Sequence, residues 1–366
     1  MRIAFLGVRD FPQRHGGIER VVEHLGAALV RRGHEVTVLT DSVGAAASIT
    51  IPSGVIVKNA PALRTKHLHS VSSGTAHLAR LSRKNVDVVH IHGVGPGVLS
   101  MIARARRIPV VLHVHGMDFE RAKWSPAARR LFTAGAGVGL RSASRIVCAS
   151  DYLAHEVSTR WGLESTVVRN GVGLMPPDQP GETLRTLGVE HGKYLLMVAR
   201  LVPEKRIEDA LAAYALLPMP RLPLIIVGSG GDSYTDGYAD ELTANPPEGV
   251  RFVGAIKADS ELIGGAAAFL TASGLEGLPI TLLEAQVAGV PIVASDIAPH
   301  LEVGGDSVAF VPVGDVSAFA KAIEAVLADP IATARAQQAA VEFRKTYDWD
   351  TIALRVEAIY EDLVKH

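Results

Sequence analysis

The feature that most constrains the fold is an alternation of short apolar, strand-like runs with helical patterns along the whole chain. Such alternation is typical of parallel sheets whose strands are joined by right-handed crossover helices. We therefore predict an α/β protein with doubly wound, Rossmann-like sheets. Ten runs are predicted as strands: 3–8, 34–40, 86–91, 110–115, 145–148, 194–199, 222–227, 251–253, 268–271 and 291–295.

The alternation is interrupted by a segment rich in proline and glycine at 170–181. This composition is typical of a linker, and 366 residues are enough for two domains that each bury a core. We predict an N-terminal lobe at 1–172 and a C-terminal lobe at 173–348. The final amphipathic stretch, 349–366, either closes the second lobe or packs back on the first. Ligands of such sheets bind beyond the carboxyl ends of the strands, so we expect the site in a cleft between the lobes.

The net charge of −1 conceals two halves of opposite sign, because residues 1–176 carry +12 and the remainder carries −13. Either the two lobes attract each other, or the basic lobe faces an anionic surface or acceptor. The N-terminus has no signal-peptide pattern, and no run approaches the ~18 apolar residues of a membrane span. Cys148, as the sole cysteine, excludes an intramolecular disulfide and is expected to be a buried thiol. We expect a cytoplasmic protein.

Two glutamates, Glu276 and Glu284, flank Pro279, which is predicted to occupy the first position of an apolar helix. The free N–H groups at such a helix start form an anion site. One carboxylate would precede this positive end, and the other would lie about one and a half turns inside it. A ligand with a central diphosphate and hydroxyl-rich groups at both ends, such as a nucleotide-sugar, fits this arrangement.

Arg200 and Lys205 stand five residues apart across the turn from the first strand of the second lobe to its helix. Cations so placed can converge on one phosphate, although solvated surface charge is the alternative. The Gly228-Ser229 turn after the next strand would let a ligand lie close. In the first lobe, Gly16-Gly17 does not match the dinucleotide-binding fingerprint, but it stands at a helix start where an anion could approach; a simple tight turn is the alternative.

His113 and His115 lie two apart at a strand end, so their side chains share one face of the sheet. Two histidines could serve a metal, but no third ligand has matching spacing nearby, and we predict no metal site. A single histidine that hydrogen-bonds a substrate, His115, is the preferred interpretation, with an ordinary strand-end histidine as the alternative. His90 and His92 end the preceding strand in a similar way.

Taken together, these motifs resemble the retaining glycosyltransferases of family 4, which have the GT-B fold, and the resemblance covers nearly the whole chain. Within the family, the chain is most similar to bacterial enzymes that build exopolysaccharide and other surface glycans. Ala272 departs from the family, which commonly has proline at this position. The matching segments are 16–20, 32–36, 115–116, 170–172, 198–201 with Lys205, 226–230, and 276–284 followed by 288–294.

The resemblance implies a role for each matching residue. Arg200 and Lys205 would bind the donor diphosphate, Glu276 the sugar hydroxyls and Glu284 the ribose, while His115 would lie near the transferred sugar. His115, Glu276, Arg200 and Lys205 are thus the candidate catalytic residues. The remaining candidate donor-binding residues are Gly16, Gly17, Asn170, Gly228, Ser229, Val253, Leu262, Gly277, Leu278 and Pro279.

A group of basic residues surrounds a helix predicted to start near Ser70. It would form a face for an anionic membrane or a lipid-diphosphate acceptor, with a solvated helix as the alternative. The residues are Arg64, Lys66, His67, Arg80, Arg83 and Lys84.

The expected reaction is transfer of a sugar from a nucleotide diphosphate donor, most often a UDP-sugar, to a hydroxyl of a glycan, a lipid-linked or a small-molecule acceptor. No Asp-x-Asp pair follows a strand, so no metal is expected. We also expect no other cofactor and no nucleic-acid partner. The alternatives are a nucleotide-sugar 2-epimerase, a phosphorylase, transfer to a natural product, or a catalytically silent binding protein.

Overall fold

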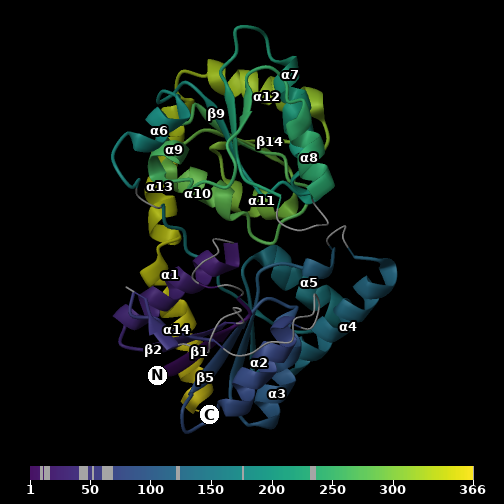
Figure 1. Cartoon of the computed structure of the whole chain (residues 1–366), viewed down its shortest axis with the longest axis vertical. Coiled ribbons are helices and arrows are strands. Elements are labelled where there is room, and N and C mark those ends of the chain that lie inside the picture. Colours follow the sequence, from purple (N-terminus) through teal and green to yellow (C-terminus); the bar gives the residue numbers. More distant parts are fainter. Residues whose placement is uncertain are drawn as a thin grey trace. The chain divides into compact units, whose positions relative to one another are not determined.

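The computed structural model describes residues 1–8, 11, 17–40, 48–51, 53–59, 69–120, 124–174, 177–230 and 236–365. The chain divides into two compact units, one formed by Met1–Gly171 with Tyr347–His366 and the other by Val172–Thr346 (Figure 1). The division falls within the segment rich in proline and glycine. None of the described helices is long and apolar enough to cross a membrane.

The first unit is built on an eight-stranded sheet in which β3 is antiparallel to β4 and the other pairs are parallel. Every residue of the central strands β5 and β6 is buried, which explains their unbroken apolar and histidine sequences. In sheet order the strands are β3 (Ser48–Thr50), β4 (Ile56–Asn59), β2 (Glu35–Thr40), β1 (Arg2–Leu6), β5 (Val88–His92), β6 (Val110–Val114), β7 (Arg145–Cys148) and β8 (Thr166–Val167).

Helices connect these strands, and α1 shows how the sequence specifies them. Its apolar residues recur every three or four positions and are buried, and Gly33 follows its end at a φ of +85°, which suits glycine. The helical segments are α1 (Gly17–Arg31), α2 (His69–Arg80), η1 (Pro96–Leu99), α3 (Ser100–Ala105), η2 (Asp118–Glu120), α4 (Pro126–Ser142) and α5 (Asp151–Trp161).

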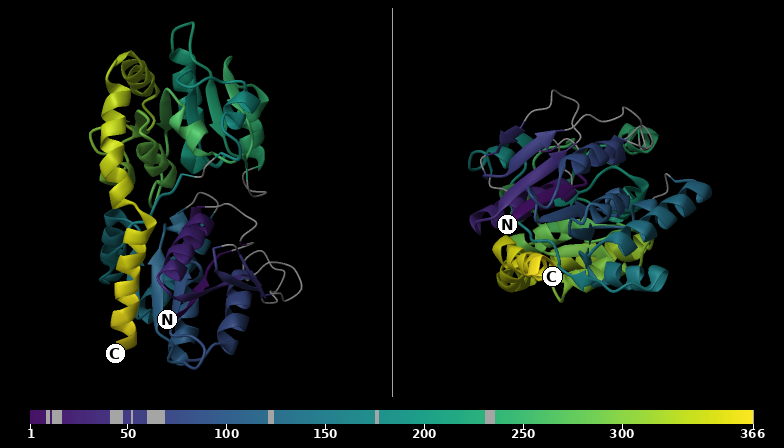
Figure 2. Two further views of the ribbon diagram at one scale, coloured as in Figure 1. Left: turned by 90° about the vertical axis from the view of Figure 1, so that its left-hand side faces the viewer. Right: turned by 90° about the horizontal axis from the view of Figure 1, so that it is seen from below.

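The final helix, α14 (Trp349–Lys365), belongs to the first unit and packs on α1 (Figure 2). The Trp349 ring stacks on His24 with ring centroids 5.5 Å apart, and Glu357 pairs with both Arg32 and His34. Tyr360 is fully buried and contacts His90 of β5 through its hydroxyl. Helix α14 thereby contributes buried side chains to the core of the first unit.

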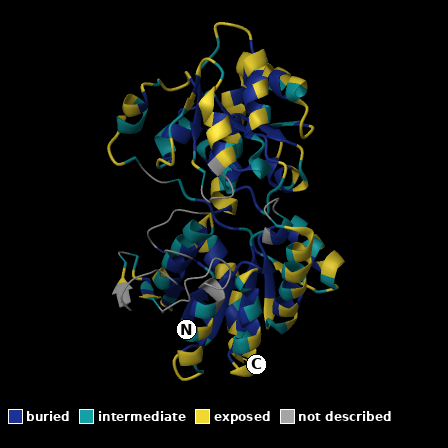
Figure 3. Cartoon of the chain, turned by 45° about the vertical axis from the view of Figure 1, so that its right-hand side comes forward, coloured by how far each residue is buried: buried dark blue, intermediate teal, exposed yellow. Residues whose placement is uncertain are grey.

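The second unit has a six-stranded, fully parallel sheet. Its strands, in sheet order, are β11 (Val250–Phe252), β10 (Leu224–Val227), β9 (Leu195–Val198), β12 (Ala268–Thr271), β13 (Ile292–Ser295) and β14 (Val308–Val311). Its helical segments are α6 (Glu182–Leu187), η3 (Pro203–Lys205), α7 (Ile207–Leu216), α8 (Asp236–Ala244), α9 (Ser260–Gly264), α10 (Ile280–Ala288), α11 (Ala298–Gly304), α12 (Val316–Ala328) and α13 (Ala332–Thr346). The strands of both sheets form buried cores (Figure 3).

The predicted fold class, two Rossmann-like parallel-sheet lobes, is confirmed, and each of the ten predicted strands is present within two residues at either end. Among the residues that the structure describes, four strands were not predicted: β3, β4, β8 and β14. Cys148 is buried and unpaired as expected, and burial raises the pKa of its thiol to about 11.

Candidate functional site

An ion pair in the second unit joins two of the predicted catalytic residues. Lys205 ends η3, in the turn after β9, and its Nζ donates to Oε1 of Glu276, in the loop between β12 and α10. Ser273 Oγ donates to the same Glu276 oxygen at 3.0 Å. Burial alone would raise the pKa of Glu276, but the nearby Lys205 ammonium and these hydrogen bonds hold it below its ordinary value. Glu276 is therefore a carboxylate at neutral pH.

The loops that carry this pair are joined through their backbones. Gly274 N–H donates to the carbonyl of Glu204 at 2.9 Å, and Ser295 Oγ donates to the carbonyl of Ser273 at 2.5 Å. The turn before α7 is itself constrained, because Arg206 adopts φ +47° and ψ +47°, which is uncommon for a residue other than glycine. Since β9 and β12 are neighbours in the sheet, the fold fixes Lys205 and Glu276 at the same edge.

His300, on α11, supports this loop network and was not found from the sequence. It is fully buried, and its Nδ1 donates to the carbonyl of Ser295 at 2.8 Å. Burial lowers the pKa of His300, while the Glu276 carboxylate opposes that shift. No local pattern marked it, because α11 mixes buried positions with the exposed Ala298 and Leu301 and the charged Glu302.

The helix start near Glu276 differs from the prediction by one residue. Pro279 is the N-cap of α10, with φ −79° and ψ 83°, and its carbonyl accepts the hydrogen bond of Leu283 N–H, so the helix begins at Ile280. Gly277 is half-buried and Leu278 is buried. Glu284 lies inside the helix with an exposed fraction of 4%, whereas Arg200, two residues beyond β9, is exposed.

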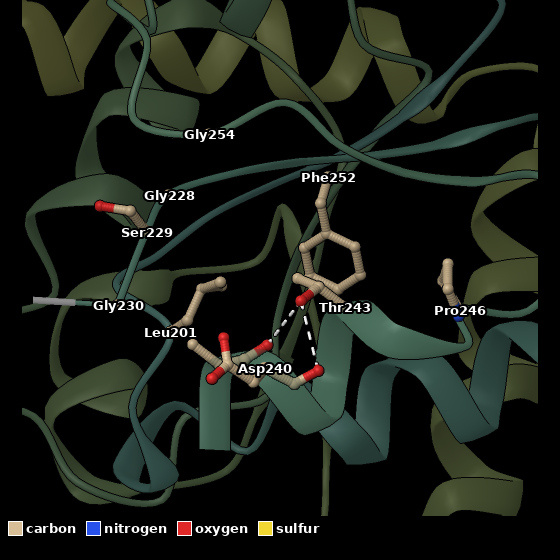
Figure 4. A pocket seen from close by; sticks show the side chains of 10 residues that line it. Leu201, Gly228, Ser229, Gly230, Asp240, Thr243, Pro246, Phe252 and Gly254 are labelled. Carbon is tan, nitrogen blue, oxygen red and sulfur yellow. Dashed lines mark hydrogen bonds between the residues drawn. The ribbon is translucent and has the colours of Figure 1, made fainter. Parts of the chain in front are cut away.

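A pocket of about 500 Å³ lies beside the turn that follows β10 (Figure 4). Gly228 requires glycine here, because its φ is +151° and an added Cβ would lie 1.8 Å from the carbonyl oxygen of Ala199. Figure 4 shows the ring of Phe252 in the middle of the view, with Thr243 and Asp240 of α8 below it; the sequence analysis missed these two residues of α8. The lining residues are Leu201, Gly228, Ser229, Gly230, Ala239, Asp240, Thr243, Pro246, Phe252 and Gly254.

Two of the candidate donor-binding residues, Val253 and Leu262, have different environments. Val253 follows β11, is half-buried and donates its N–H to the carbonyl of Ile226 at 3.0 Å. Leu262 has no exposed surface, its N–H is capped by Asp259, and its carbonyl accepts from the Tyr194 hydroxyl. The predicted ligand contact of Leu262 therefore does not fit its position, because its side chain is part of the core.

In the first unit, the structure brings His115 and Asn170 together. His115 follows β6 and is half-buried; its Nε2 lies 3.0 Å from His92 Nδ1, and its Nδ1 lies 3.4 Å from Asn170 Nδ2. Both ring nitrogens of His115 thus face protein groups. His92 is a neighbour that the sequence analysis noted only as a similar strand-end residue.

The expectation that no third histidine lies near the His113 pair was wrong. His90, His92 and His113 hold ring nitrogens within 4.8 Å of one another, because His92 and His113 are opposite each other in the register of β5 and β6. The rings nevertheless form a stack. The planes of His90 and His92 lie within 8° of parallel with centroids 4.3 Å apart. Imidazole binds a metal through a lone pair in its ring plane, so two stacked rings cannot both direct a lone pair at one ion.

The other predicted residues lie at the margins of the first unit. Gly17 is the first residue of α1 and is exposed, Arg80 ends α2, and Arg83 and Lys84 are exposed in the turn that follows. Helix α2 begins one residue before its predicted start. Gly16, Arg64, Lys66 and His67 lie outside the described residues.

Comparison with protein families matches each half of the chain to a glycosyltransferase domain. Residues 15–174 match the model for Glycosyltransferase Family 4, and residues 185–343 match the model for Glycosyl transferases group 1.

Individual proteins give the same picture. A glycogen synthase of Mycobacterium tuberculosis is 30% identical over 60% of this chain and 55% of its own length. The O-antigen chain mannosyltransferase B of Escherichia coli is 34% identical over 41% of this chain and 42% of its own. The chain thus spans about half the length of these curated relatives. The solved structure of Anabaena HepE in complex with UDP-glucose superposes with a TM-score of 0.80 at 20% identity and covers 99% of this chain and 100% of its own.

The second match ends three residues before the second unit does, and the first covers most of the long N-terminal segment of the first unit. With two Rossmann-like parallel-sheet units in this order, the chain belongs to the GT-B glycosyltransferases, with a family 4 domain followed by a group 1 domain.

Proposed function

We propose that this chain transfers a sugar from a nucleotide diphosphate donor to a hydroxyl acceptor, with retention of configuration at the transferred carbon. The observation that carries the proposal is the Lys205–Glu276 pair, held by Ser273 at the carboxyl edge of β9 and β12. Ligands of parallel α/β sheets bind at this edge. An ammonium and a carboxylate here match a ligand with an anionic diphosphate next to a hydroxyl-rich sugar.

The pair can exchange its partners when such a donor binds. The diphosphate would compete for the Lys205 ammonium through charge-assisted hydrogen bonds, and Glu276 would then accept hydrogen bonds from sugar hydroxyls. Because both side chains are largely buried, with exposed fractions of 17% and 13%, their interactions with a ligand are poorly screened. Removal of one such donor from developing negative charge typically costs ~3 kcal/mol of activation free energy.

For the chemistry we propose attack on the same face that the leaving group departs from, through an oxocarbenium-like sugar. The departing phosphate oxygen accepts the proton of the acceptor hydroxyl as the new glycosidic bond forms and the bond to phosphate breaks. Lys205 and Arg200 supply positive charge that a divalent cation supplies in other phosphate-transferring sites. We therefore propose that neither a metal nor another cofactor is required.

Relatives guide the choice of substrates. The HepE structure contains UDP-glucose, which supports a UDP-sugar as the first donor to test. The similarity to an O-antigen mannosyltransferase supports an acceptor in bacterial surface-glycan assembly.

The experiment is to incubate the full chain with a panel of nucleotide-sugars, with and without hydroxyl acceptors, and to measure the release of free nucleotide diphosphate. We expect turnover of at least one donor, a product that keeps the donor's anomeric configuration by NMR, and loss of turnover in Lys205→Ala. Lys193→Ala, an exposed lysine in a turn of the same unit, is the matched control. A chain that neither hydrolyses nor transfers from any donor, and whose melting temperature none of them raises, would contradict the proposal.

We also propose peripheral contact with anionic membrane through Arg80, Arg83 and Lys84, which are exposed. Flotation with anionic and neutral liposomes tests this contact. The triple replacement of these residues by glutamate is expected to abolish any preference for anionic liposomes. Equal partitioning of the unmodified chain onto both kinds of liposome would contradict it.

A further inference from the structure

The hydrogen bond between His92 and His115 joins two imidazole rings in nearly one plane. The two nitrogens are 3.0 Å apart, the ring planes differ by 9°, and the centroids are 5.3 Å apart. That spacing and orientation place the rings edge to edge, so that one N–H points at the lone pair of the other. His92 comes from the last residue of β5 and His115 follows β6, so two neighbouring strands fix the pair.

The Asn170 side chain determines where the proton of His115 lies. The amide nitrogen of Asn170 faces His115 Nδ1, and an amide nitrogen can only donate. A neutral His115 must then accept at Nδ1 and carry its proton on Nε2, which donates to His92 Nδ1. His92 in turn carries its proton on Nε2. If the Asn170 amide were turned over, its oxygen would accept from His115 Nδ1–H, and His115 Nε2 would accept from His92. The nitrogen of His115 that carries the proton therefore shows which of the two hydrogen-bond arrangements is present.

The surroundings keep the pair uncharged. Burial lowers the pKa of His115 to about 3 and lowers the pKa values of His90, His92 and His113 as well, and each charged imidazole would repel the others. Other polar groups at the stack are the Tyr360 hydroxyl of α14, which contacts His90 Nδ1, and the backbone of Val168, which hydrogen-bonds His113. A positive charge on His115 would therefore have no anionic partner among these groups.

We propose that His92 is a positioning residue that holds His115 as a neutral imidazole with its proton on Nε2. His92 acts through His115, and its own side chain has an exposed fraction of only 1%. The consequence for catalysis rests on the proposed function: a neutral His115 would not oppose the positive charge that develops on the transferred sugar as the diphosphate departs, whereas an imidazolium would.

The tautomer can be measured without any substrate. Proton–nitrogen correlation spectra of the histidine side chains of the full chain at neutral pH distinguish Nε2-protonated, Nδ1-protonated and charged imidazole, and His115→Gln assigns the signal. We expect the Nε2-protonated neutral form in the unmodified protein. A charged His115, or one protonated on Nδ1, would overturn the proposal even if no His92 variant folded.

Two His92 variants separate positioning from packing. His92→Asn keeps an acceptor oxygen close to the place of Nδ1, so the Nε2-protonated form of His115 should persist. His92→Phe keeps the ring but removes the acceptor, and His115 should shift to the other form or to a mixture. His90→Phe is the matched control, because it alters the same stack but not the bond to His115. An unchanged His115 signal in a folded His92→Phe would refute the assignment.

The kinetic readout distinguishes this inference from the proposed function. In an active protein, we expect His92→Phe to lower kcat roughly tenfold, or ~1.4 kcal/mol, with KM changed less than twofold, and His92→Asn to recover most of the loss. A purely structural role would instead lower stability and activity alike in His90→Phe and His92→Phe. Should the unmodified chain show no turnover, the proposed function fails, while the tautomer result still stands or falls by itself.

Discussion

The two units differ in the charge of the side chains at the carboxyl edges of their sheets. The second unit holds a charged pair, Lys205 and Glu276, in loops joined by backbone and side-chain hydrogen bonds. The first unit gathers histidines whose burial and mutual repulsion keep them neutral. The Lys205 ammonium can exchange its carboxylate partner for an anionic ligand. The neutral histidines of the first unit offer hydrogen-bonding groups without adding charge. Of the two groups, the pair in the second unit is therefore the place to test for diphosphate binding.

The largest expected effect is that of Lys205→Ala. Loss of the ammonium removes stabilisation of the leaving group and leaves Glu276 buried without its cation, so kcat should fall about 100-fold to 1,000-fold, or ~3 to 4 kcal/mol. Initial rates with the best donor measure this. Lys193→Ala should match the unmodified chain, and a Lys205→Ala enzyme within roughly threefold of it would remove Lys205 from the mechanism.

The next largest effect is expected for Glu276→Gln, which keeps the shape of the side chain but removes its charge. We expect kcat to fall about tenfold or more, since Lys205 loses its anionic partner and the sugar loses a charged acceptor. Stability should change with pH too. The pKa of Glu276 is lowered on folding, so its stabilising contribution is present above its unfolded-state value of about 4.5 and is lost as the pH falls through the lower folded value.

Thermal unfolding between pH 3 and pH 7 tests the second part of this prediction. The unmodified chain should lose more stability towards low pH than Glu276→Gln does. Parallel curves for the two proteins would show that Glu276 is not stabilised as a carboxylate in the folded state.

A smaller effect is expected for His300→Leu. The change removes the hydrogen bond to the carbonyl of Ser295 and should lower the free energy of unfolding by about 1 to 3 kcal/mol. It should also lower kcat several-fold, because Ser295 holds the loop of Ser273 and Glu276. His191→Leu, at an exposed turn of the same unit, is the control. Destabilisation with an unchanged kcat would limit His300 to a structural role.

The smallest effect should come from removing metal ions. If protein cations neutralise the diphosphate, dialysis against EDTA should change the rate less than twofold. Activity that disappears with EDTA and returns with a divalent cation would show that a metal, and not Lys205 and Arg200, neutralises the diphosphate.

The sequence predicts strands well where apolar runs are bounded by helical patterns and poorly where pairing alone defines them. Strands β3 and β8 contain three and two residues, too few for a periodic signal. Strands β4 and β14 contain four residues each and follow turns, and β14 lies at the edge of its sheet. Leu262 was misassigned for a related reason, since its burial depends on the packing of α9 and not on its neighbours in sequence.

The site shows the same limit. Lys205 and Glu276 were predicted because each stands beside a strand end or helix start with a local signature. His92 and His300 were not, because their roles depend on partners 23 and 5 residues away that only the sheet register and the fold of a loop bring close. Three-dimensional coincidences of this kind have no local sequence pattern.

The most direct test of the central claim is a crystal structure of the full chain with an intact or slowly hydrolysed nucleotide-sugar. We predict that Lys205 Nζ leaves Glu276 and lies about 2.7 to 2.9 Å from a diphosphate oxygen, while Glu276 accepts hydrogen bonds from the sugar. A bound donor whose diphosphate lies elsewhere, with Lys205 still paired to Glu276, would contradict the account.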